Sequence, residues 1–582
     1  MDVEMEILQT SQGPLFSNSR RTSVLLVDEL LAMIIKLICA ETWQDSALAS
    51  LARVCKGTHE PALDALWHTQ RSLLPVLIHV TELFEEDPGL SCVTYIGSRG
   101  EYSHETSDPH LCCIRTPKQH HWDRILKYSK RIKVFKNTPK EGVRSRYMYR
   151  HPKIADSVIR GLNYFQGTLF PNLTTLKWPL RGCQNLPSTA IKPFLGPSLR
   201  YLYLEKSQNT SDIPQFIEQK SSALKLFYVS KTRSSLFQIT QSFINSLDGI
   251  ETYEDQSGNT YSPAKWIALG TRPKLVRLRT SSFEDKRQYY EERIAAVRPV
   301  VSGLFSALQS LHVRTAAMQS ILDHLSLIPR FPVCTSLTVY LNQSVPDGGR
   351  IIQWNGFMHE VHYQFAEEKQ VEELVDLVPK RFPKNLRTFA LLSNVHNGMD
   401  SSPTITSHVF QSLLSFKHLT QVYVCTDWRV YLDDNMLREM AQSWPNLEYM
   451  DFTPQPSCTK RYDQSAIIAT LHGLLPFVEY CPKIRELGVV LCSYDRGHDG
   501  PIALPSSSSL CKLETLHVGP SYMTSPKAVA SFIAENFPCL KNFTCWTACK
   551  DSQYEGWAHK SMWLEAWKLA KQARAKQHQS HS

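Results

Sequence analysis

Histidine and cysteine side chains crowd one short part of the chain. The residues are His110, Cys112, Cys113, His120 and His121, and both types are ligands for Zn²⁺. Their spacing matches no common zinc finger, and adjacent cysteines cannot easily share one tetrahedral site. We therefore interpret this part as a loop that carries ligand types by chance, and we expect no metal and no other cofactor.

A basic stretch with interleaved tyrosines follows, from position 118 to 160. Basic and aromatic residues together can bind nucleic acid through phosphate contacts and base stacking. The alternative is a solvated helix face followed by a basic loop. The net charge of +9 over 582 residues is a mild excess, so we favour the second interpretation and expect nucleic acid not to be the partner.

Residues that could perform catalysis form no recognisable set. The sequence has no phosphate loop, nucleophile elbow, HExxH or paired Cys-x-x-Cys motif, so we expect a protein that is not an enzyme. Its 15 cysteines show no framework spacing, which indicates a reducing compartment. The acidic N-terminus lacks a signal pattern, and no apolar run reaches the roughly 20 residues of a membrane span. We expect a cytoplasmic or nuclear protein without a membrane partner.

The elements that would position binding residues begin with three short helices. Apolar residues at helical spacing predict a helix within 25–38, with Asp28 and Glu29 favouring its first turn. A second helix is predicted over 47–56 and a third over 60–67, with Pro61 in its first turn. The core of such a small bundle is too limited to be stable without a partner or the next domain.

From about residue 165 a Leu-x-x-Leu-x-Leu-like strand recurs, usually after a helical stretch. Spacings such as 173 to 199 (26 residues) and 275 to 308 (33 residues) are typical of degenerate leucine-rich repeats. Gaps at 224–275 and 334–386 are roughly two repeats wide, and residues 361–365 could be the strand missing from the second. The predicted strands start at Leu173, Leu199, Leu275, Leu308, Leu386, Leu419, Leu447, Ile484, Leu513 and Leu540, with weaker copies at Leu224 and Cys334.

These patterns predict an α/β chain of five parts. We expect a flexible N-terminus (1–22), a helical segment (23–80) and a linker with one connecting helix near Trp122 (81–160). An irregular leucine-rich-repeat solenoid shaped like a horseshoe follows (161–560), then a C-terminal helix with a basic tail (561–582). Helices are predicted over 371–378, 434–443 and 526–536, so strand and helix would alternate and neighbouring units would bury both apolar faces.

The N-terminal helices resemble an F-box, especially as found in basidiomycete fungi. The matching segments are 26–31, 51–56, 60–67 and 72–75, and residues 122–134 are similar to a block that follows the F-box in those proteins. The repeats after it complete the same order of parts. The F-box usually has proline where this sequence has Val27.

The resemblance implies a substrate-recognition subunit of a Skp–cullin–F-box ubiquitin ligase. Such an F-box buries apolar side chains against a Skp-type adaptor, while the solenoid would hold an unknown target protein. The alternative is a repeat scaffold that binds protein without a ligase, which Val27 keeps open. Carried over position by position, the adaptor-binding residues would be Leu26, Leu30, Leu31, Val54, Cys55 and Trp67.

Target-binding residues are expected between the leucines of the strands. If side chains alternate, these positions point away from the leucine face and line the concave surface. The candidates are Lys177, Arg200, Tyr203, Arg277, Arg279, His312, Thr388, Tyr423, Glu448, Asp451, Arg485 and His517.

Overall fold

The computed structural model describes most of the chain, in segments. These are residues 28–40, 44–87, 91–96, 101–106, 110–136, 153–165, 167–180, 187–205, 212–220, 223–230, 239–257, 261–280, 303–315, 318–341, 352–354, 357–359, 368–393, 404–426, 428–454, 467, 469–493, 512–545 and 556–581. The predicted flexible N-terminus, residues 1–22, lies outside them.

Three helices form the N-terminal helical module: α1 (Asp28–Ala40), α2 (Gln44–Leu51) and α3 (Lys56–His68). The predicted first helix is confirmed. The second helix was predicted to end at residue 56 but ends at Leu51, and the third was predicted to begin at residue 60 but begins at Lys56. The reason is that Cys55 is extended and acts as the N-cap of α3. The buried Thr58 hydroxyl accepts from the Cys55 N–H (3.3 Å) and donates to the Leu51 carbonyl (2.8 Å), which closes the turn. Pro61 therefore lies inside α3 and not in its first turn.

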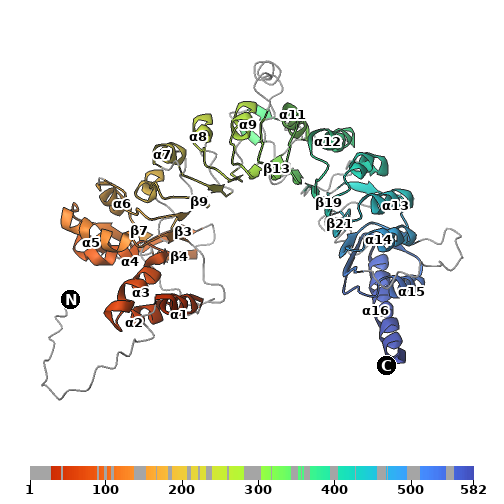
Figure 1. The fold of residues 1–582 in the computed structure, drawn as a ribbon, viewed down its shortest axis with the longest axis horizontal. Helices are drawn as coiled ribbons and strands as arrows, with labels where there is room; N and C mark the ends of the chain where they lie inside the picture. The colour runs from red at the N-terminus through yellow and green to blue at the C-terminus, as the bar shows by residue number, and fades with distance from the viewer. Residues whose placement is uncertain are drawn as a thin grey trace.

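A single parallel sheet runs through the rest of the molecule and curves into an arc, with strands inside and helices outside (Figure 1). This is a leucine-rich-repeat solenoid behind a helical N-terminus, as predicted. Its fifteen strands are, in spatial order, β1 (Thr69–Gln70), β6 (Val134–Phe135), β8 (Thr175–Trp178), β9 (Tyr201–Leu204), β10 (Leu226–Val229), β11 (Thr252–Asp255), β12 (Arg277–Thr280), β13 (Ser310–Thr315), β14 (Ser336–Leu341), β17 (Thr388–Ser393), β19 (Gln421–Cys425), β21 (Tyr449–Asp451), β22 (Glu486–Gly488), β24 (Thr515–Gly519) and β26 (Asn542–Cys545).

Every predicted repeat supplies a strand of this sheet, which starts two residues after the predicted leucine. Strand β11 fills the first gap. The proposed extra strand at 361–365 lies outside the described residues, and β14 pairs directly with β17, so no strand stands between them. That prediction was wrong.

Helices cover the convex side of the sheet. The helices predicted over 434–443 and 526–536 are confirmed to the residue, and 371–378 lies within a longer helix. The covering elements are α6 (Asp156–Asn163), η3 (Ser188–Phe194), α7 (Ile213–Lys220), α8 (Gln241–Asn245), α9 (Pro263–Gly270), α11 (Met318–Leu327), α12 (Glu368–Arg381), η5 (Ser407–Ser415), α13 (Asp434–Ser443), η7 (Leu471–Leu474), α14 (Leu475–Tyr480) and α15 (Pro526–Asn536).

The sheet begins well before residue 161, where the sequence placed the solenoid. Its first strand, β1, follows α3 without a linker and pairs with β6. Residues 81–160 also contain more than the expected connecting helix. They hold the end of η2 (Ile78–Leu83), which follows α4 (Leu74–Leu77), then the small sheet of β2 (Phe84–Asp87), β5 (His110–Cys113) and β7 (Lys153–Ile154), the hairpin of β3 (Ser91–Ile96) and β4 (Glu101–Thr106), and α5 (Gln119–Ser129).

One continuous apolar core, from Trp67 to Ala570, lies between the sheet and its helices. At its C-terminal end α16 (Gly556–His581) caps the last strand, and Trp563 and Trp567 stack on Phe543 of β26. The predicted capping helix is confirmed, but it continues through most of the expected tail. Three short strand pairs complete the described structure: β15 (Ile352–Trp354) with β16 (Phe357–His359), β18 (Thr404–Thr406) with β20 (Arg429–Tyr431), and β23 (Cys492–Ser493) with β25 (Tyr522–Met523).

Among the described helices, none combines the length and the apolar character that crossing a bilayer requires.

Candidate protein-binding surfaces

Two of the six expected adaptor-binding residues are buried in the chain's own core. Leu31 is closed off inside the helical module, and Trp67 is 8% exposed. The Trp67 ring lies 4.7 Å from Tyr128 of α5 and 5.7 Å from His79 of η2, measured between ring centroids. Neither Leu31 nor Trp67 is presented to a partner in this structure, so the prediction for these two is corrected. Trp67 is buried because the small module packs on α5 and η2, and Leu31 is buried because α1 packs on α2 and α3.

The other four positions differ from one another. Val54 and Cys55 are exposed in the turn before α3, Leu30 is half-buried, and Leu26 lies outside the described residues. The exposed pair therefore remains a candidate for partner contact, while Leu30 can contribute only part of its surface.

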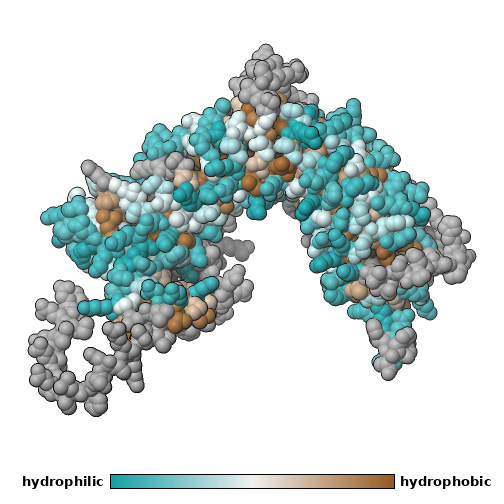
Figure 2. Space-filling view, viewed as in Figure 1, coloured by the Kyte–Doolittle hydropathy of each residue, from teal (hydrophilic) through white to brown (hydrophobic). Residues whose placement is uncertain are grey.

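Sequence reasoning missed two exposed apolar residues of α1. Met33 is 53% exposed and Leu37 is 70% exposed, and they lie one turn apart on the same face; Val54 is 58% exposed. Figure 2 shows apolar surface gathered over α1. Helix α1 is apolar nearly all round, whereas a helix that packs on one side only carries a single apolar stripe. The apolar residues beyond a single stripe were the signal in the sequence that α1 has a second apolar face, which is not buried.

A cleft of about 770 Å³ opens beside this turn, between α2 and α3. Cys55 lies at its rim, and a hydrogen bond with the Thr58 side chain lowers the pKa of the Cys55 thiol. The lining mixes apolar side chains with basic ones, so the cleft suits a partner segment with apolar and acidic residues. It is lined by Ala49, Ala52, Arg53, Cys55, Lys56, His59, Leu63 and Leu66.

The module is fixed to the solenoid by a buried arginine as well as by Trp67. Arg131, in the turn after α5, is 10% exposed in its side chain. Its guanidinium donates to Glu60 at 2.5 Å and to Asp64, both on α3. These hydrogen bonds raise the pKa of Arg131 against the lowering effect of burial. The contacts hold α3 against the first repeat.

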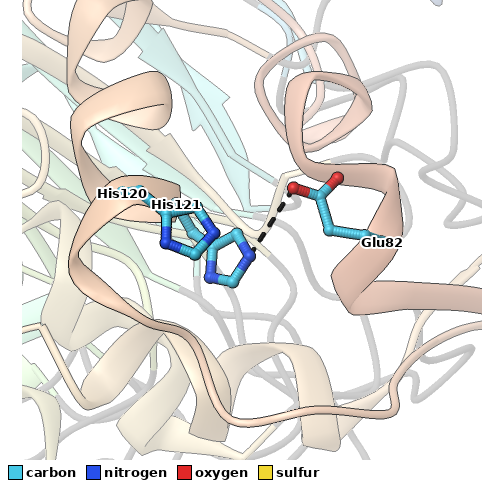
Figure 3. A group of neighbouring side chains, drawn as sticks. All are labelled: Glu82, His120 and His121. Atoms are coloured by element: carbon cyan, nitrogen blue, oxygen red, sulfur yellow. Dashed lines mark ion pairs between the residues drawn. The ribbon is translucent and has the colours of Figure 1, made fainter.

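The suspected zinc ligands do not assemble as a set. Cys112 and Cys113 lie on β5, whereas His120 and His121 lie on α5 and approach Glu82 (Figure 3). The His121 Nδ1 accepts from the Lys118 N–H at 2.8 Å, so in the neutral ring the proton is on Nε2, which lies 3.5 Å from Glu82.

Glu82 is also engaged by a cation, since Arg124 lies 2.5 Å from its carboxylate. The backbone N–H of Glu82 and the nearby Arg124 lower the pKa of the carboxyl, and burial lowers the pKa of His121. A metal would have to displace Arg124 from Glu82 and the proton from His121. This arrangement is therefore a helix cap joined to an ion pair.

The concave face of the sheet carries two continuous rows of side chains, with one residue per row from each of the thirteen strands from β8 to β26. Alternate residues are buried toward the helices, which leaves the rows facing the hollow of the arc. The first row is Thr175, Tyr201, Leu226, Thr252, Arg277, Ser310, Ser336, Thr388, Gln421, Tyr449, Glu486, Thr515 and Asn542. The second is Lys177, Tyr203, Tyr228, Glu254, Arg279, His312, Thr338, Ala390, Tyr423, Asp451, Gly488, His517 and Thr544.

Nine of the twelve candidates lie in these rows. Arg277 and Thr388 are in the first, and Lys177, Tyr203, Arg279, His312, Tyr423, Asp451 and His517 are in the second.

Arg200, Glu448 and Arg485 do not lie in either row. Each precedes its strand by one residue and follows a buried residue of the core (Leu199, Leu447 and Ile484). Their side chains are exposed or half-buried, but they lie at the N-terminal edge of the sheet and outside the strands.

Side-chain contacts join neighbours along the rows. The Lys177 Nζ lies 5.1 Å from the centre of the Tyr203 ring, and Tyr203 packs 5.8 Å from Tyr228. Toward the other end, His517 lies 3.3 Å from Glu486. Burial, with Glu486 nearby, raises the pKa of Tyr423 to about 12, so its hydroxyl stays protonated and can donate. The face thus offers aromatic rings and fixed polar groups, the residue types that protein interfaces favour.

The sequence matches no protein-family model and no curated protein. Similar solved structures include an internalin, InlF, of Listeria monocytogenes, at 10% identity over 70% of this chain and 92% of the internalin, with a TM-score of 0.32. Another is the leucine-rich repeat-containing protein LegL7 of Legionella pneumophila, at 11% identity over 53% of this chain and 89% of LegL7, with a TM-score of 0.26. Likenesses this distant do not inform function. The register of the fifteen strands itself establishes the fold as an α/β leucine-rich-repeat solenoid that carries a helical module at its N-terminus.

Proposed function

We propose that this chain is the substrate-recognition subunit of a Skp–cullin–F-box type ubiquitin ligase. In this proposal the helical module docks a Skp-type adaptor and the solenoid holds a target protein. The chain carries no catalytic residue of its own; it raises the local concentration of the target beside the conjugating enzyme. One observation supports the docking step most: Met33, Leu37 and Val54 are large apolar side chains of the module that are more than half exposed.

The exposure of these side chains favours a protein partner. Leaving three large apolar side chains in water forfeits the burial free energy that a partner would recover, about 25 cal/mol per Å². Leu31 and Trp67 hold the module together from inside, so they support the docking surface without forming it. Docking therefore rests on the outer face of α1 and on the turn around Val54.

A copurification experiment tests the proposal. The full chain is coexpressed with a Skp adaptor, and Leu37→Asp and Val54→Asp are compared with Leu564→Asp. Leu564, 47% exposed on α16 at the other end of the arc, supplies a matched leucine-to-aspartate control. We expect each module variant to weaken adaptor binding by about thirty-fold, since an interface anchor contributes about 2 kcal/mol. The control variant should bind like the wild type.

The second candidate function is a repeat scaffold that binds protein without a ligase. It is favoured by the concave face, which is as well formed as the module. Deleting residues 23–70 would not separate the two functions, because Trp67 and β1 belong to the solenoid core. The surface variants Leu37→Asp and Leu564→Asp separate the two functions, because neither side chain belongs to the core. If the wild-type chain does not copurify with the adaptor, or Leu37→Asp binds it as tightly as Leu564→Asp, adaptor docking through this face is refuted and the scaffold remains.

A further inference from the structure

The cleft between α2 and α3 combines an apolar lining with a basic rim. Its volume is about 770 Å³, and the apolar part of the lining is Ala49, Ala52, Leu63 and Leu66. The basic residues around it are Arg53, Lys56 and His59, all with exposed side chains. The His59 ring is already engaged, because its Nδ1 lies 2.8 Å from the Ala52 carbonyl and its Nε2 lies 3.9 Å from Glu60. The two cations that remain for an occupant are Arg53 and Lys56.

These two cations have no counter-charge in the part of the chain that the structure describes. Neither Arg53 nor Lys56 forms an ion pair or a side-chain hydrogen bond there. The carboxylates of Glu60 and Asp64 on α3 accept hydrogen bonds from Arg131. The first turn of α3 contains Lys56 and no acidic residue, although a helix N-terminus favours negative charge. The rim of the cleft is therefore positively charged and suits an acidic segment.

The N-terminal segment of this chain, residues 2–8, has the complementary pattern. Acidic and apolar residues alternate along it, in the order Asp2, Val3, Glu4, Met5, Glu6, Ile7 and Leu8. In an extended chain successive side chains point to opposite sides, so such a sequence presents carboxylates on one side and apolar groups on the other. The two sides match the basic rim and the apolar lining of the cleft.

The connection from this segment to α1 is long enough to reach the cleft. Helix α1 is about 20 Å long and packs on α2 and α3. Residues 9–27 connect the segment to α1, and a chain of this length can span roughly 60 Å when it is extended. A tethered segment has an effective concentration of about 1 mM at its site. It therefore outcompetes a free segment of equal affinity that is present at micromolar concentration.

We propose that the cleft between α2 and α3 binds the chain's own residues 2–8, with their carboxylates toward the basic rim and their apolar side chains toward the apolar lining. The bound segment covers the Cys55 thiol at the rim and lies beside Val54. It therefore competes with any protein that docks on this turn, and the partner must displace it. This self-docking goes beyond the proposed function and does not depend on a ligase.

Alkylation of Cys55 by iodoacetamide measures how often the cleft of the full chain is occupied. The wild type is compared with a neutral-segment variant, which combines Asp2→Asn, Glu4→Gln and Glu6→Gln, and the modified peptides are quantified by mass spectrometry. At an effective concentration of about 1 mM, a segment with a Kd of about 0.1 mM leaves roughly one tenth of the chains open. Cys55 should therefore react about ten-fold faster in the variant. Cys539, exposed at the C-terminal end of the arc, is the internal control and should react equally in both chains.

Peptide binding in trans identifies the occupant. A labelled peptide of residues 1–12 is titrated into both chains and followed by fluorescence anisotropy. We expect it to bind the neutral-segment variant about ten-fold more tightly than the wild type, whose cleft is already occupied. Adding Arg53→Gln to this variant should weaken peptide binding by about three- to five-fold, as expected for an exposed ion pair. Adding Arg438→Gln, at an exposed arginine of the convex helix α13, is the matched control and should leave the affinity unchanged.

Four results would overturn the proposal. They are equal Cys55 rates in the wild type and the neutral-segment variant, an equal acceleration of Cys539, equal peptide affinity of the two chains, and equally tight binding of a scrambled peptide of the same composition. If a Skp adaptor protects Cys55 while the neutral-segment variant reacts like the wild type, the cleft belongs to the adaptor and the self-docking proposal fails. Adaptor binding is measured separately, so a chain that never copurifies with an adaptor but protects its own Cys55 refutes only the ligase role.

Discussion

Replacing Trp67 with alanine tests whether this residue contacts a partner or holds the helical module to the solenoid. The indole is 8% exposed and packs on Tyr128 and His79. An aromatic side chain of this size buries on the order of 150–200 Å², which at about 25 cal/mol per Å² corresponds to about 4–5 kcal/mol. Core tryptophan truncations cost about 3–5 kcal/mol, in agreement with that estimate. Trp67→Phe keeps one ring in place and should cost about 1–2 kcal/mol.

The assay is hydrogen–deuterium exchange, read in peptides that cover α3 and α5, with adaptor binding measured in parallel. We expect Trp67→Ala to speed exchange in both helices, because the ring joins them, and to leave the distant strands β22 and β24 unchanged. Trp67→Phe should bind the adaptor like the wild type, since the indole is not on the docking face. The reasoning is refuted if Trp67→Ala leaves exchange in α3 and α5 unaltered, or if Trp67→Phe loses the adaptor as completely as Leu37→Asp does.

Two further predictions concern the core of the solenoid. Burial lowers the pKa of His324 to about 4, so as pH falls from about 6.5 the unfolded chain takes up a proton that the folded chain refuses. His324 should therefore contribute a fall of about 1.4 kcal/mol per pH unit in the free energy of unfolding between about pH 6.5 and pH 4. Chemical denaturation of His324→Gln should show a pH dependence shallower by this amount, and a slope identical to that of the wild type would contradict the prediction. Trp563→Ala removes a buried ring that donates to the Ser521 carbonyl at 3.0 Å, and should cost about 3–5 kcal/mol. We expect this variant to speed hydrogen–deuterium exchange in β26 more than in β9. An equal increase in both strands would contradict a capping role limited to the C-terminal end.

The sequence predicted the solenoid well because its signal is repeated. Each strand places a leucine or its equivalent at fixed offsets, and neighbouring units reinforce the same register. Strand β11 was missed for a physical reason. Tyr253 stands where the other strands carry an aliphatic residue or phenylalanine, and Asp255 is fully buried at a core position, with the Tyr261 hydroxyl donating to it at 2.6 Å. A buried carboxylate satisfied by a tyrosine cannot be recognised from hydrophobic spacing.

The candidate surfaces were only partly predictable. Alternation placed Arg279 and His312 correctly on the concave face, because strand geometry fixes which side a residue occupies. It could not show which neighbours from other repeats each of these side chains meets. In the module, Trp67 was assigned to the partner and Leu37 was overlooked. Which face of a short helix meets the next domain is decided by tertiary packing, and local spacing does not determine it.

The direct passage from α3 into β1 has a consequence for reach. Because no hinge separates the helices from the first strand, whatever sits on α1 is held at a set span from any point on the inner face. Each additional strand lengthens that span by roughly 4.8 Å. The number of repeats between the module and a given residue therefore sets the distance between a protein bound at α1 and a protein bound on the inner face. Chains of this architecture could change that distance by gaining or losing repeats.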